Sequence, residues 1–123
     1  CQFYKRVGYH DFEGIVLDGS EGPRIVQAMG REFHTLVLRH HGLITGGSTC
    51  TWAFVRHLAF IRNTEVQLAA MATGRTVPTP VDVMINCRQQ FEGGSAQAGA
   101  AQRHPEWPAL IRRLNALDPS WKT

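Results

Sequence analysis

The sequence predicts a single domain of the α/β class. Short apolar runs bounded by glycine, such as residues 14–18, are typical of buried strands. Longer segments carry apolar residues at helical spacing, with capping residues before them and glycine after them. With 123 residues, 43% of them apolar, the chain is long enough to bury a modest core.

The first two predicted elements are a strand and a short helix. Residues 14–18 read Gly-Ile-Val-Leu-Asp and end before Gly19, which predicts a buried strand. Ser20 then offers an N-cap, Pro23 falls in the first turn, and Gly30 follows the last apolar position. This arrangement predicts a helix between Ser20 and Gly30.

Two further strands are predicted on either side of a pair of histidines. Residues 35–38 and 43–45 are short apolar runs, and Gly46 and Gly47 close the second of them. His40 and His41 therefore lie in the turn between the two strands. Functional side chains favour such turns, because the scaffold is rigid and the turn is open to solvent.

The second half of the chain is predicted to be helical. Ser48 is the expected cap of the longest helix, which runs to about residue 73 and stops at Gly74. Further helices are expected from residue 81 toward 91 and from 105 to 117. These limits predict a main unit at 1–92, a Gly/Ala/Gln-rich linker at 93–104, and a C-terminal helix and tail at 105–123.

Composition argues against several classes of function. The net charge is +3 and the isoelectric point is near 9.1, but the basic residues are scattered, so nucleic-acid binding is unsupported. No run approaches the roughly 20 apolar residues that span a bilayer. Cys1, Cys50 and Cys87 show no CxxC spacing, which argues against a disulfide framework or zinc knuckle. We expect a cytoplasmic protein without membrane or nucleic-acid partners.

His41 is the strongest candidate for a metal ligand. It follows an apolar strand and precedes Gly42, so its imidazole would project at a strand end where it could reach a metal ion. A hydrogen-bonded structural histidine is the alternative. A catalytic zinc needs about three protein ligands, and the chain has neither HxH nor HExxH. A metal site at His41 would therefore need another polypeptide segment.

The motif around His41 resembles a known family. Residues 38–47, Leu-Arg-His-His-Gly-Leu-Ile-Thr-Gly-Gly, are similar to the class II aldolase/adducin superfamily, whose pattern there reads Leu-Arg-Asn-His-Gly-Leu. The resemblance extends to residues 3–14, 60–67, 106–110 and 118–121. It implies a class II aldolase-like α/β/α sandwich with a mainly antiparallel central sheet, of which this chain forms the C-terminal half.

The resemblance also implies a chemistry. Family members hold a divalent metal ion, usually zinc, with an HxH pair from the first half of the domain and the histidine that corresponds to His41. A metal-dependent lyase is therefore expected, which cleaves a carbon–carbon bond through a metal-stabilised enediolate of a small oxygenated carbonyl substrate. Two alternatives stay open: an iron(II)-dependent oxygenase or decarboxylase of secondary metabolism, and a non-catalytic, adducin-like assembly module.

Two residues near these motifs have competing interpretations. His40 stands where the family pattern has asparagine, either as a solvent-facing substitution or as an added donor beside the metal. Glu65 lies on the apolar face of the long helix. It would pair with Arg62 or with another subunit, or else support a metal-bound imidazole.

Further site residues and partners are expected from the same motifs. Tyr9, His10 and Glu13 form a polar and aromatic cluster that would border a substrate pocket. The remaining metal ligands would come from the N-terminal half of the domain, as a separate or cleaved chain, and family members form homo-oligomers. For Cys1 we expect one of three origins: an arbitrary boundary, a register error in a split gene, or a cut immediately before it, made by its own thiol as the nucleophile or by a protease.

Overall fold

A computed structural model describes residues 1–15, 19–97 and 104–122. Its first half contains the strands β1 (Val7–His10), β2 (Thr35–Leu38) and β3 (Gly42–Thr45), with the helix α1 (Glu21–Met29) between β1 and β2. The second half contains the helices α2 (Cys50–Ala72), α3 (Val81–Gln97) and α4 (Trp107–Leu117), followed by the 3₁₀ turn η1 (Pro119–Lys122). The α/β class is thus confirmed.

The three strands form a mixed sheet in the order β1-β2-β3. β1 runs parallel to β2, with His10 opposite Leu38, whereas β3 is antiparallel to β2, with Gly42 opposite Leu38. The expectation of a mainly antiparallel sheet is therefore not met among the described residues. The connection through α1 brings the chain back to the end of the sheet where β1 began, and this return makes the β1–β2 pair parallel.

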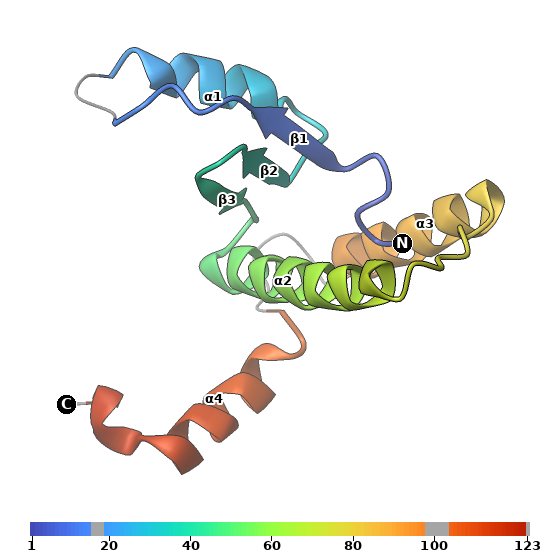
Figure 1. Cartoon of the computed structure of the whole chain (residues 1–123). Coiled ribbons are helices and arrows are strands. Elements are labelled where there is room, and N and C mark those ends of the chain that lie inside the picture. The colour runs from blue at the N-terminus through green and yellow to red at the C-terminus, as the bar shows by residue number, and fades with distance from the viewer. Residues whose placement is uncertain (16–18, 98–103, 123) are drawn as a thin grey trace.

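The core lies where the central strand meets the start of α2. Leu36 of β2 is fully buried, and Trp52 and Val55 from the first turns of α2 are 7% and 6% exposed. α1 packs against β1 and β2, and α2 packs against β3, so the sheet lies between these two helices (Figure 1). The buried residues of β2 and α2 thus form one small core, with one helix on each side of the sheet.

Several local predictions are confirmed and others need correction. β2, β3 and α1 lie where the sequence predicts them, but β1 was not predicted, because Gly8 and His10 interrupt its apolar pattern. Most of the strand predicted at residues 14–18 lies outside the described residues. Gly14, at its start, has φ +104° and is not in a strand.

The helical half follows the prediction with shifted ends. α2 is capped by Thr49, whose side chain accepts a hydrogen bond from the backbone N–H of Trp52, so the prediction of Ser48 as the cap was wrong by one residue. α3 continues to Gln97, into the segment that the sequence-based boundaries assign to the linker. α4 begins at Trp107 and projects away from the sheet (Figure 1).

Among the described residues, no helix is both long enough and apolar enough to cross a membrane.

Candidate functional site

The candidate site lies at the edge of the sheet where the parallel strands β1 and β2 end. His10 is the last residue of β1, and the turn after β2 carries His40 and His41. Because parallel strands end at the same edge, His10 and His41 come to lie at one side of the molecule. Both border a hollow of about 70 Å³, together with Phe12 and Glu21.

His41 is exposed and stands in the tight turn that the sequence predicts. Its backbone N–H donates a hydrogen bond to the carbonyl of Leu38 at 3.0 Å, which closes the turn. Its imidazole stacks on the ring of Phe12, with 5.1 Å between centroids and 9° between planes. The ring is therefore held at the rim of the hollow.

The conformation of His40 is compatible with either histidine or the asparagine of the family pattern. His40 has φ +63°, in the left-handed region that most side chains avoid. Asparagine and histidine are both enriched in this region, so either residue suits the turn. His40 is exposed, as its interpretation as a solvent-facing substitution requires.

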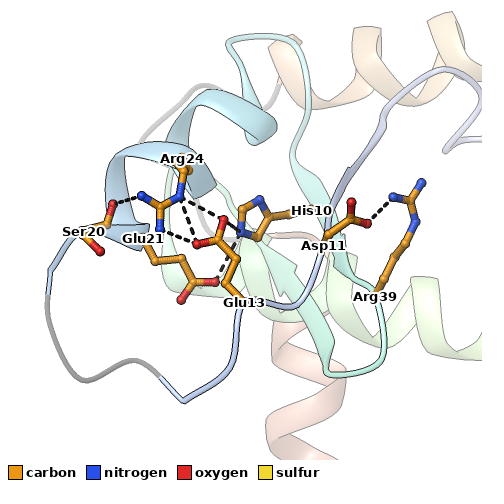
Figure 2. A network of polar contacts seen from close by, with 7 residues as sticks. All are labelled: His10, Asp11, Glu13, Ser20, Glu21, Arg24 and Arg39. Carbon is orange, nitrogen blue, oxygen red and sulfur yellow. Dashed lines mark hydrogen bonds and ion pairs between the residues drawn. The ribbon is translucent and has the colours of Figure 1, made fainter.

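His10 lies inside a cluster of acidic side chains (Figure 2). Its Nε2 is 3.3 Å from Oε1 of Glu21 and 3.4 Å from Oε1 of Glu13, and its side chain is only 10% exposed. Glu21 belongs to the first turn of α1, where the helix dipole favours a negative charge. The start of α1 thus supplies a largely buried carboxylate to the last residue of β1.

The His10–Glu13–Glu21 cluster offers three donor atoms within 4.8 Å of one another, close enough to hold a metal ion. Arg24 also binds Glu13, however, through Nε at 2.9 and 3.0 Å from the two carboxylate oxygens and through a short contact from Nη2. This guanidinium lowers the pKa of Glu13 below its usual value. The cluster therefore already contains a cation that offsets its charge, as Figure 2 shows.

The structure brings together only some of the residues that the sequence singled out. His10, Glu13 and His41 converge on the same edge. Tyr9 precedes His10 on a strand, so it points to the other face; it is 56% exposed and lies beneath the Arg39 guanidinium. Cys1 has an exposed thiol and precedes β1, at the end of the strand opposite to His10.

Sequence reasoning missed Phe12, Glu21 and Arg24, which complete this edge. Phe12 lies within the motif at residues 3–14, and Glu21 directly follows the predicted cap. Neither position has a local pattern that indicates a functional role. Glu65 is exposed on α2, and no ion pair joins it to Arg62, although both residues are described. The pairing expected between these two residues is absent.

The chain is similar over almost its whole length to several known proteins. No family model matches it. The structure of an aldolase II superfamily protein from Pseudomonas syringae superposes with a TM-score of 0.80 at 34% sequence identity, over 95% of this chain and 46% of that one. An aldolase class 2 protein of Pseudomonas aeruginosa is 27% identical over 94% of this chain and 45% of its own length.

Relatives with other names match over the same region. Alpha-adducin of Rattus norvegicus is 33% identical over 90% of this chain, which covers 16% of the adducin. A Streptomyces roseochromogenus protein named 4-hydroxy-3-prenylphenylpyruvate oxygenase/4-hydroxy-3-prenylbenzoate synthase is 31% identical over 98% of this chain and 44% of its own length. The chain spans about half the length of the aldolase class 2 relatives that it matches. It belongs to the class II aldolase/adducin superfamily.

Proposed function

We propose that this chain supplies part of the active site of a metal-dependent lyase, which cleaves a carbon–carbon bond in a small oxygenated carbonyl substrate. The observation that carries the proposal is the edge at which β1 and β2 end. There the exposed imidazole of His41 faces the same hollow as the His10–Glu21 pair. The proposed ligand and a histidine–carboxylate pair thus border one small space.

The donor chemistry of this edge fits a divalent metal at His41. Imidazole nitrogen is a preferred ligand of zinc and iron, and no described residue makes a hydrogen bond to the ring of His41. A metal there would polarise the carbonyl oxygen of a substrate. His41 is one ligand, and we propose that the rest come from the portion of the domain that the longer relatives contain.

The residues around His41 would bind the substrate and hold a proton beside it. His10, whose Nε2 lies 3.3 Å from Oε1 of Glu21, would serve as the general acid–base beside the substrate. Glu13 is held by Arg24 and adds a second carboxylate next to His10. Phe12 limits the access of water to one face of the His41 ring.

Iron(II)-dependent oxygenase or decarboxylase activity is the second candidate, supported by the 31% identity to the Streptomyces oxygenase. The same imidazole would serve iron as well as zinc. A non-catalytic assembly role, suggested by the adducin relatives, is the third. We also expect this protein to form a homo-oligomer, as the family resemblance implies. Light scattering on the purified protein would measure its mass in solution.

Metal analysis of the purified protein, produced together with the remainder of its domain, separates these candidates. We expect one metal ion per chain, and His41→Gln to weaken its binding by more than about 100-fold, beyond the 10- to 100-fold typical of losing an outer partner. His40→Asn is the matched control, because asparagine also tolerates the positive φ of that position.

Activity then decides between the two enzymes. Bound zinc, with cleavage of hydroxy ketones in a substrate panel, supports the lyase. Bound iron with oxygen consumption supports the oxygenase instead. If the protein binds neither metal, and if His41→Gln does not change its activity, only the assembly role remains.

A further inference from the structure

We infer that Phe12 is a positioning residue, which sets the orientation of the His41 imidazole. The functional importance of that orientation rests on the proposed role of His41 as a metal ligand. The two rings are nearly parallel, with 9° between their planes and 5.1 Å between their centroids. Offset stacking of this kind is a preferred geometry for paired rings.

The stack on Phe12 is a direct contact of the His41 ring, and its near-parallel geometry defines the plane in which that ring lies. The hydrogen bond to Leu38 comes from the backbone N–H of His41 and leaves the side chain free to rotate. Among the described residues, no side chain or carbonyl makes a hydrogen bond to the imidazole. Histidines that bind metals normally have their second nitrogen fixed by a carboxylate or carbonyl. Phe12 takes over this orienting task through ring stacking.

Phe12 is itself held by ion pairs on both sides of it in the sequence. Asp11, immediately before it, accepts a hydrogen bond from the Arg39 guanidinium at 2.5 Å, and Arg39 lies in the same turn as His41. Glu13, immediately after it, binds Arg24 of α1 (Figure 2). The loop is therefore tied both to the turn that carries His41 and to α1.

The electrostatics of these two pairs agree with their geometry. The Arg39 hydrogen bond lowers the pKa of Asp11, and the Arg24 hydrogen bond lowers the pKa of Glu13. Each lowered pKa means that the charged form of the carboxylate is the form that its arginine binds. Each exposed pair adds little to stability by itself, but two of them around one residue restrict where its ring can lie.

Simple burial of an apolar ring does not account for this arrangement. Phe12 remains 47% exposed, so it removes only part of its surface from water. Hydrophobic contact has no preferred angle, whereas the two rings lie within 9° of parallel. A residue that served only to cover apolar surface would be expected to turn inward. Phe12 instead lies against an exposed imidazole.

The first test measures the ring of His41 in the metal-free protein. With histidine side chains labelled for NMR, and His41 assigned by His41→Gln, we expect the ring current of Phe12 to displace the His41 ring-proton signals. Phe12→Leu should remove that displacement and raise the ring's mobility, whereas Phe12→Tyr should preserve both. His41 signals that are the same in Phe12→Leu and the unmodified protein would overturn the inference.

The second test measures Zn²⁺ affinity by calorimetry in the protein with its complete domain. Phe12→Leu should weaken binding by about 2- to 12-fold, the range expected for one aromatic stack. Phe54→Leu is the matched control, because Phe54 is 51% exposed and contacts Trp107 rather than the site. Equal affinity in Phe12→Leu and Phe54→Leu would overturn the positioning role.

The two tests separate this inference from the proposed function. Absence of Zn²⁺ binding in the unmodified protein would refute the zinc site while the NMR signals still report whether Phe12 orients the ring. Binding that depends on His41 but not on Phe12 would leave the zinc site intact and refute the inference.

Discussion

Replacement of Gly8 by alanine tests how tightly the site depends on the packing of α1 against β1. Gly8 is buried in β1 and pairs with Leu36. A Cβ at this position would lie 2.7 Å from the carbonyl oxygen of Ala28, 3.0 Å from Cδ1 of Leu36 and 3.1 Å from Cδ2 of Phe33. The first of these contacts is with helix backbone, which cannot rotate away as a side chain would. α1 must therefore move.

The expected cost follows from these contacts. Overpacking of a well-packed site costs about 1–3 kcal/mol, and the lower entropy of the unfolded chain returns about 0.4–1 kcal/mol. We expect Gly8→Ala to reduce the free energy of unfolding by roughly 1–2 kcal/mol. Gly22→Ala is the control within α1, because nothing lies within 4 Å of its Cβ. It should instead stabilise the protein by up to about 1 kcal/mol.

The assay is urea unfolding followed by circular dichroism, with the slope of the transition compared between variants. A displacement of α1 should also separate Glu21 from His10, now 3.3 Å apart, and NMR signals of the His10 ring would report it. The reasoning would be refuted by a Gly8→Ala protein as stable as the unmodified one. A Gly22→Ala protein as unstable as Gly8→Ala would refute it too.

Two further predictions concern the dependence of stability on pH. Arg24 lowers the pKa of Glu13 from its usual 4.5. The stability that this pair contributes is therefore present above pH 4.5 and is lost as pH falls through the lower pKa of the folded state. Glu13→Gln should make the loss of stability at acid pH less steep. Burial lowers the pKa of His104 from 6.5, and its ring packs edge-on against Trp52 at 4.3 Å. Stability should therefore fall as pH drops below 6.5, and His104→Gln should reduce that fall. Thermal unfolding at a series of pH values would measure it. If stability depended on pH in the same way in His104→Gln and the unmodified protein, His104 would not be the group responsible.

Local sequence patterns predicted most of the helices and two of the three strands among the described residues. The apolar runs of β2 and β3, and the helical spacing in α1, α2 and α4, are properties of neighbouring residues. β1 was missed because Gly8 and His10 break its apolar pattern. The reason for both residues is tertiary: Gly8 makes room for the Ala28 carbonyl, and His10 meets Glu21.

The first residue of α2 also depends on more than local sequence. Ser48 and Thr49 are adjacent hydroxyl residues, and either could cap α2 by its chemistry. Backbone geometry selects Thr49, whose φ and ψ are extended. The α/β/α sandwich remains a prediction, since the described residues form one three-stranded mixed sheet.

The sequence by itself determined the family of this protein and its strongest candidate ligand, because the Leu-Arg-His-His-Gly-Leu motif is contiguous and places His41 in a turn after a strand. Only the tertiary structure decided which residues surround that histidine. The parallel pairing of β1 with β2 brings Phe12 against His41, and the packing of α1 brings Glu21 and Arg24 to His10 and Glu13. These contacts join segments that are distant along the chain. Such contacts depend on strand pairing and helix packing, and local periodicity does not determine them.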